Sequence, residues 1–124
     1  MQTYKPSISK GPQWGQEAEA LAADYLYEKG FRIIARNYRY RKAEIDIIAC
    51  KESCLCFVEV KARNNLQYGY PESFVNGAKQ VLIRAAAEHY IMRYDWQQAV
   101  RFDIISVRRA QDKLHIEHFE DAFY

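Results

Sequence analysis

The sequence lacks any long apolar run, since no segment approaches the roughly 20 residues that a membrane-spanning helix needs. The N-terminal stretch MQTYKPSISK also lacks the apolar part of a secretory signal. We therefore expect a cytoplasmic protein without a membrane partner. Cysteine is scarce, with three residues and no paired C-x2-C spacing of the kind that builds structural zinc sites. We expect Cys50, Cys54 and Cys56 to be buried or half-buried residues in or beside strands.

An excess of one charge sign is also missing, since 18 Lys and Arg residues balance 16 Asp and Glu residues for a net charge of +2. The apolar share of 49% is large enough for a core and excludes a disordered chain. The length of 124 residues suits one domain, which we place at residues 13–124 behind a flexible N-terminal arm at residues 1–12. The total charge hides an uneven layout, because residues 29–42 hold six cations and no acid while the C-terminal end is acidic.

Apolar periodicity predicts two helices and five strands. The first helix starts near Trp14 and stops at Gly30, and the second runs from an N-cap at Asn76 to about Tyr94. Residues 37–42 either continue the first strand or form a turn, and residues 64–71 form a loop. Strands are predicted at residues 31–36, 44–50, 55–63, 101–107 and 114–119. The order α-β-β-β-α-β-β predicts an α/β domain.

The two strands at residues 44–50 and 55–63 contain the most unusual pattern. A two-residue turn and a four-residue loop between them give the same hairpin register. In that register Asp46 faces Glu59, and Glu44 faces Lys61. Directly opposed side chains have Cβ atoms about 5 Å apart, so two carboxylates are expected side by side.

Two facing carboxylates repel each other, so the register predicts a compensating cation. Asp46 and Glu59, with a backbone carbonyl that we assign to Val60, form a partial cage for Mg²⁺ or Mn²⁺. Lys61 lies on the same face as Glu59, where an ammonium can hold a water molecule and offset the charge of a phosphate. A structural interpretation stays open, in which Glu44 and Lys61 form an ordinary ion pair and the two acids point to solvent at a sheet edge.

These residues lie in two of five notable segments. The five are Gly15–Ala20, Arg36–Arg39, Glu44–Ala49, Phe57–Arg63 and Arg101–Asp103. Together the segments resemble the bacterial YraN family of small predicted endonucleases, whose fold is similar to archaeal Holliday-junction resolvases and to the wider PD-(D/E)xK nuclease superfamily. The resemblance spans about residues 14–107, and E-I-D followed by F-V-E-V-K-x-R is its most specific part. Two departures are Ala43, where the family usually has glycine, and Ala62, where it has threonine. Neither position is expected to bind metal.

The resemblance implies a restriction-endonuclease-like core, with a mixed central sheet flanked by helices. It implies that Asp46 and Glu59 bind the metal and that Lys61 is the catalytic lysine. It also matches Glu17 to an additional acidic residue that reaches the metal or its water shell, and it matches Lys79 to a basic position near the site.

Several cations near this site are candidates for contact with DNA phosphates. Residues 36–42 interleave Tyr38 and Tyr40 with basic residues, a mix that follows phosphates and stacks on bases. The same stretch could be a charged edge strand that blocks aggregation, and Lys79 could be an ordinary surface lysine. The nucleic-acid-binding candidates are Arg36, Arg39, Arg41, Lys42, Arg63 and Lys79.

The residues and the resemblance together predict a metal-dependent endonuclease that hydrolyses phosphodiester bonds in DNA, with Mg²⁺ or Mn²⁺ as cofactor. Branched and single-stranded DNA, in recombination, repair or DNA uptake, stay open as substrates. The alternatives are a catalytically silent nucleic-acid-binding adaptor that keeps the nuclease fold, and a protein-interaction module with a tyrosine-rich surface. A helicase or ATPase partner and a homodimer both suit the small size of the chain. We assign Asp103 to structure, and the histidines show no ligand pattern.

Overall fold

The computed structural model describes residues 12–64 and 75–124. Most of the predicted arm at residues 1–12 and of the predicted loop at residues 64–71 therefore lies outside the described residues. Within them, no helix has both the length and the apolar character needed to cross a bilayer. The elements follow the predicted order: α1 (Pro12–Glu28), β1 (Arg32–Tyr40), β2 (Ala43–Lys51), β3 (Cys54–Arg63), α2 (Gly77–Arg93), β4 (Ala99–Ala110) and β5 (Lys113–Phe123).

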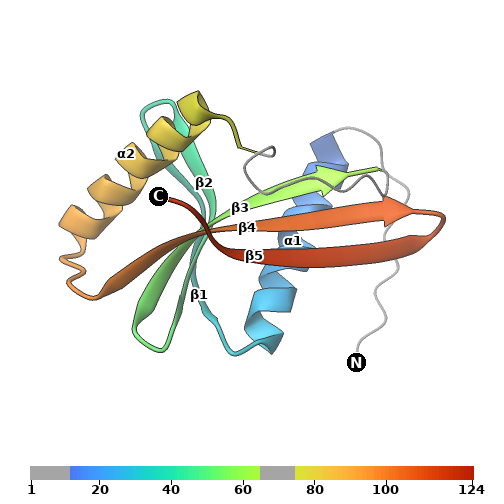
Figure 1. Cartoon of the computed structure of the whole chain (residues 1–124), viewed down its shortest axis with the longest axis horizontal. Coiled ribbons are helices and arrows are strands. Elements are labelled where there is room, and N and C mark those ends of the chain that lie inside the picture. The colour runs from blue at the N-terminus through green and yellow to red at the C-terminus, as the bar shows by residue number, and fades with distance from the viewer. Residues whose placement is uncertain (1–11, 65–74) are drawn as a thin grey trace.

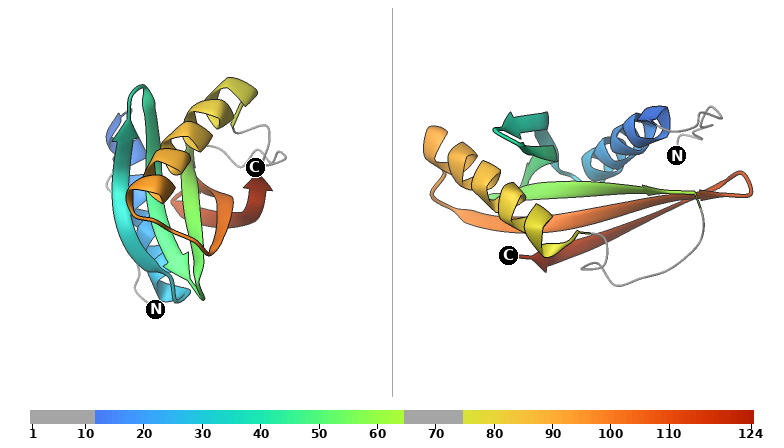
Figure 2. Two further views of the ribbon diagram at one scale, coloured as in Figure 1. Left: turned by 90° about the vertical axis from the view of Figure 1, so that its left-hand side faces the viewer. Right: turned by 90° about the horizontal axis from the view of Figure 1, so that it is seen from above.

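The five strands form one mixed sheet in the order β1-β2-β3-β4-β5 (Figure 1). Neighbouring strands are antiparallel except β3 and β4, which are parallel because α2 lies between them in the chain. The helices α1 and α2 lie on opposite faces of the sheet (Figure 2). This arrangement confirms the predicted α/β fold with a mixed central sheet flanked by helices.

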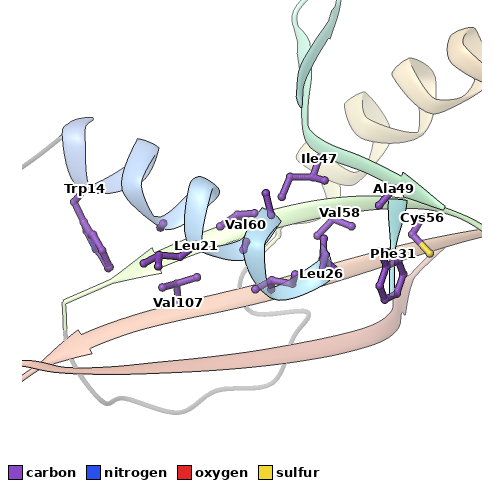
Figure 3. Packing of buried hydrophobic residues seen from close by; sticks show 14 residues of the cluster. Trp14, Leu21, Leu26, Phe31, Ile47, Ala49, Cys56, Val58, Val60 and Val107 are labelled. Carbon is purple, nitrogen blue, oxygen red and sulfur yellow. The ribbon is translucent and has the colours of Figure 1, made fainter. Parts of the chain in front are cut away.

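The face of the sheet beneath α1 is packed with apolar side chains (Figure 3). Leu26 of α1 is fully buried and belongs to one cluster with Ile47 and Val58 from the sheet. Cys56 lies in the same cluster, which confirms its predicted place as a small buried residue in a strand. The alternation of β3 sends its other side chains to the opposite face, where Phe57 packs edge-on against Tyr90 of α2.

Local sequence signals set the ends of both helices. Gly30 ends α1 in the left-handed region at φ +95°, and the N–H of Phe31 donates to the carbonyl of Leu26. Asn76 caps α2, since its side chain accepts a hydrogen bond of 2.9 Å from the N–H of Lys79. Both of these predicted signals are confirmed.

The hairpin between β2 and β3 has the predicted register. Glu52 and Ser53 form a two-residue turn with φ values of +52° and +64°, and Lys51 pairs with Cys54. Residues 37–42 were predicted either to continue the first strand or to form a turn. The strand β1 continues to Tyr40, and the turn follows at residues 41–42. The strands β4 and β5 are longer than predicted, because they pair almost to the tight turn at residues 111–112.

The strand β2 departs from strict alternation near Asp46. Alternation predicts that Ile45 and Ile47 share a face, but Ile45 packs on the side of α2 and Ile47 on the side of α1. Opposite this point, Asn37 of β1 has a left-handed backbone with φ +53°. The β1–β2 hairpin twists there and turns away from the direction of β3, β4 and β5 (Figure 1). Ile45 therefore lies on the face opposite to the one that strict alternation from Ile47 predicts.

Candidate functional site

Asp46 lies where β2 separates from β3. The last paired residues of the two strands at this end are Ile47 and Val58, so the next N–H groups of β3 on the side of β2 need other acceptors. The carboxylate of Asp46 supplies one, because its Oδ2 accepts a hydrogen bond of 2.8 Å from the N–H of Val60. The side chain of Asp46 thus replaces a backbone acceptor. Its hydrogen bond with Val60 holds it at the point where β2 and β3 separate.

Glu59 is the second carboxylate of the predicted pair, and it is 4% exposed. Its Oε1 lies 2.5 Å from the Nζ of Lys79 and 3.9 Å from the Nζ of Lys61. Its Oε2 is buried and has no hydrogen-bond partner within residues 12–64 and 75–124. A buried carboxylate oxygen without a donor is costly, and a bound cation would satisfy it.

The acids and lysines change each other's proton affinity. Burial and the nearby charge of Glu59 raise the pKa of Asp46 to about 8. Burial and the neighbouring ammonium of Lys79 lower the pKa of Lys61. Burial acts in the same direction on Lys79, but its hydrogen bond with Glu59 outweighs it and raises the pKa of that lysine. The site therefore holds a carboxyl group that is hard to ionise without an additional positive charge.

A third acid comes from α1, and it is Glu19. Carboxylate oxygens of Glu19, Glu44 and Asp46 all lie within 4.8 Å of one another, and we call these three residues the acidic cluster. Asn37 links two of them, since its amide donates to Glu19 at 2.7 Å and to Glu44 at 2.9 Å. The sequence does not reveal Glu19, because the helical period of α1 shows which residues flank its apolar face but not where α1 lies along the sheet.

Glu17, the acid expected from α1, has a different neighbour. Its Oε2 lies 3.9 Å from the guanidinium of Arg109 on β4, outside the acidic cluster. The two glutamates are separated by only one residue, so they point from α1 in different directions. Glu44 also lies elsewhere than predicted: it is paired with Arg39 across the β1–β2 hairpin, at 2.9 Å, and not opposite Lys61.

A cavity of about 270 Å³ opens onto the two predicted metal ligands. It lies between the β1–β2 hairpin and α2, and Asp46, Glu59, Lys42 and Lys79 are among its lining residues. A second hollow of about 580 Å³ lies between the hairpin and α1. Its lining includes Arg36 with the acidic cluster residues Glu19 and Glu44, so Glu44 borders both spaces.

The remaining predicted cations have other neighbours than Asp46 and Glu59 in the described residues. Arg39 is bound to Glu44, and the guanidinium of Arg41 lies over the ring of Tyr40, 5.3 Å from its centroid. Arg63 lies at the exposed end of β3, four residues beyond Glu59, which is about 13 Å along an extended strand. The structure thus brings Lys42, Lys61 and Lys79 near Asp46 and Glu59. Arg36 and Arg39 line the second hollow.

A separate buried polar group is centred on Asp103 of β4, which pairs with Val58 of β3. Asp103 is fully buried and accepts hydrogen bonds from Arg101 at 2.8 and 2.9 Å. A ring nitrogen of His118 lies 2.7 Å from it, and the N–H of Asp121 donates to it. Burial opposes ionisation, but these hydrogen bonds outweigh it and lower the pKa of Asp103. This arrangement agrees with a structural role.

Residues 18–107 match the model of an uncharacterised protein family, UPF0102. The chain belongs to the UPF0102 family. A UPF0102 protein of Flavobacterium psychrophilum is 44% identical over 89% of this chain and 92% of its own length. Another, from Chlorobaculum tepidum, is 46% identical over 90% of this chain and 93% of its own length.

UPF0102 is the family that the sequence motifs resemble, since it corresponds to the YraN family. Glu19, Asp46, Glu59, Lys61 and Lys79 all fall inside the segment that matches the UPF0102 model. Glu17 lies one residue before that segment begins. The family itself is uncharacterised, so the chemistry of this UPF0102 protein has to be argued from the site.

Proposed function

We propose that this protein is a metal-dependent endonuclease that hydrolyses phosphodiester bonds in DNA. The observation that supports the proposal is the convergence of two carboxylates, Asp46 and Glu59, on one cavity that they share with Lys79. Lys61 approaches the same carboxylate of Glu59. Acids that would repel each other, next to lysines in an open cavity, are typical of a site that binds a cation and a phosphate.

The residues present fit a hard divalent cation. The donors are carboxylate oxygens, which Mg²⁺ and Mn²⁺ prefer, and the Oε2 of Glu59 is buried without a partner in the described residues. Asp46 and Glu59 would hold the ion, with the carbonyl of Val60 as a third ligand. We place Glu19 in the role first given to Glu17, because Glu19 lies in the acidic cluster with Asp46.

A divalent ion bound there would supply positive charge that polarises a phosphate and makes water more acidic. Lys61 is positioned to orient the attacking water, because its ammonium lies beside the carboxylate of Glu59. Lys79 is held at the same carboxylate and can offset the negative charge that develops on the phosphate. Lys42 lines the cavity of Asp46 and Glu59, and Arg36 lines the second hollow. Both are candidates for contact with neighbouring phosphates.

Cleavage of labelled DNA tests the proposal. Single-stranded, duplex and branched DNAs are incubated with Mg²⁺, with Mn²⁺ or with EDTA, and Asp46→Ala and Glu59→Ala are compared with the wild type. The exposed acid Asp24 on α1 offers a matched control, Asp24→Ala. We expect metal-dependent cleavage by the wild type and the control, and none by the two site variants. Equal cleavage by all four proteins would exclude this site.

Calorimetric titration with Mn²⁺ separates the proposal from a silent adaptor. An enzyme of this kind binds Mn²⁺ through Asp46 and loses that binding in Asp46→Ala. Salt-sensitive DNA binding without any Mn²⁺ binding at millimolar concentration would favour the adaptor instead.

A further inference from the structure

A third hollow, of about 550 Å³, lies on the outer side of α2 next to the tip of β1. Its lining residues are Tyr40, Ala85, Glu88, His89, Met92 and Arg93. None of them belongs to the proposed metal site. Met92 is 82% exposed, so a large apolar side chain borders open solvent here. We call this space the Tyr40–His89 hollow.

The aromatic pair at its edge is fixed in place. The rings of Tyr40 and His89 are stacked, with centroids 4.2 Å apart and an angle of 23° between their planes. A hydrogen bond of 2.7 Å joins Nδ1 of His89 to the hydroxyl of Tyr38, which holds the imidazole. A flat surface whose side chains are already ordered loses little conformational entropy when it binds a flat partner.

The charges around the hollow favour an anionic chain. Arg93 lines the hollow, and the guanidinium of Arg41 lies over the ring of Tyr40. Lys42, the next residue, lines the cavity of Asp46 and Glu59. Glu88 is the one acid among the residues that line the hollow, so the two arginines outnumber acids at the hollow itself. A polyanion with flat apolar groups fits both the charge and the aromatic surface.

The hollow continues the proposed site along one side of α2. Lys79 and Leu82 belong to the cavity of the acids, and Ala85 and His89 follow at helical spacing. From Lys79 to His89 the helix rises about 15 Å. This distance is short enough for consecutive nucleotides of one strand to reach from the acids to the aromatic pair.

We propose that the Tyr40–His89 hollow binds an unpaired nucleobase of a strand whose phosphate lies at Asp46 and Glu59. The inference rests on the proposed function and adds the substrate class, which is DNA that is single-stranded next to the cleaved bond. A base in a duplex is stacked and paired, so it cannot enter such a hollow without leaving the helix.

Fluorescence anisotropy with Ca²⁺ in place of Mg²⁺ and Mn²⁺ tests this inference apart from cleavage, because Ca²⁺ also takes carboxylate ligands and offsets their charge. A labelled dT10 strand, a ten-base-pair duplex and a U10 RNA strand are titrated with the wild type, with Tyr40→Ala and with Met92→Glu. The control is Tyr27→Ala, which removes a tyrosine that is 73% exposed on α1. Thermal unfolding of each variant shows whether it is folded.

We expect Tyr40→Ala and Met92→Glu to weaken dT10 binding by roughly tenfold or more, as for the loss of a base-stacking contact, and to leave duplex binding and Mn²⁺ binding unchanged. Tyr27→Ala is expected to bind like the wild type. An equal loss with U10 supports a site for unpaired bases of either nucleic acid. A loss confined to U10 would overturn a DNA substrate.

Failure of this inference and failure of the proposed function give different results. If no DNA is cleaved but Tyr40→Ala loses dT10 binding, the hollow binds bases and the nuclease proposal fails. If DNA is cleaved but Tyr40→Ala and Met92→Glu bind dT10 as tightly as Tyr27→Ala does, the base-binding inference is wrong. A protein segment that binds the hollow in place of dT10 would also overturn it.

Discussion

The carboxylate of Asp46 accepts a hydrogen bond from the backbone N–H of Val60 at the point where β2 leaves β3. The same carboxylate belongs to the acidic cluster and faces the charge of Glu59. Asp46 therefore helps to hold the strand divergence together while it lies in an electrostatically unfavourable place. Site residues that oppose stability in this way give testable effects on both stability and binding.

Replacing Asp46 by asparagine should stabilise the metal-free protein. The amide keeps an oxygen for the N–H of Val60 but removes a carboxyl group whose pKa burial and Glu59 raise, which lowers the stability of the folded protein at neutral pH. We expect the free energy of unfolding in EDTA to rise by roughly 1–3 kcal/mol, measured by urea denaturation. Adding Mn²⁺ should raise the melting temperature of the wild type but not of Asp46→Asn. A variant less stable than the wild type in EDTA would contradict this account of the charge.

The two glutamates of α1 form a matched pair for testing the ligand set. Glu19→Ala is expected to weaken Mn²⁺ binding by roughly tenfold or more, because Glu19 lies in the acidic cluster. Glu17→Ala is expected to leave Mn²⁺ binding unchanged, since Glu17 lies beside Arg109. Calorimetric titration measures both. The reverse order of effects would restore the assignment of Glu17 to the metal site.

The lowered pKa of the buried Asp103 predicts that the free energy of unfolding decreases at acidic pH. The pKa of Asp103 is held below its ordinary value of 3.8, so the folded form binds a proton less readily than the unfolded chain. Its contribution is fully present above about pH 4 and is lost as the pH falls through the lower folded-state value. We expect Asp103→Asn to cost about 3 kcal/mol at pH 7, because Arg101 and His118 lose their carboxylate.

Urea denaturation of both proteins at pH 7 and pH 3 measures this effect. The difference in the free energy of unfolding between wild type and Asp103→Asn should shrink at pH 3. A difference that is the same at both pH values would show that Asp103 acts through packing and not through its charge.

Alanine substitutions at two glycines should change the free energy of unfolding in opposite directions. Gly30 adopts φ +95°, a conformation that an L-residue rarely adopts, so Gly30→Ala should lower the free energy of unfolding by about 1–2 kcal/mol. Gly15 lies within α1, and a Cβ there meets nothing within 4 Å. Gly15→Ala should therefore raise the free energy of unfolding by about 0.5–1 kcal/mol. Thermal or urea denaturation of the pair checks both signs.

The sequence was sufficient to predict the hairpin that carries the acids. Its register follows from the turn at Glu52–Ser53 and from the apolar pattern of two strands, which are local properties. The break in alternation at Asp46 was not predictable in the same way. It depends on the left-handed backbone of Asn37 and on the divergence of β2 from β3, and no period in the sequence reports either one.

The position of each helix along the sheet also could not be read from the sequence. Glu17 and Glu19 both flank the apolar face of α1, and only the placement of that helix against the β1–β2 hairpin brings Glu19 to Asn37. Lys79 was expected near the site because of a resemblance. Its contact with Glu59 depends on the connection that carries the chain across the sheet between β3 and β4.

The parallel pairing of β3 with β4 has a consequence for the order in which the molecule forms. The strands β1, β2 and β3 follow one another through short turns, so Asp46 and Glu59 can meet early in folding. We expect β4 to reach β3 later, because closing the long connection that contains α2 is slow. Lys79, which offsets the charge of Glu59, arrives with that late step. We therefore expect the two carboxylates to oppose the assembly of the sheet until the crossover is complete.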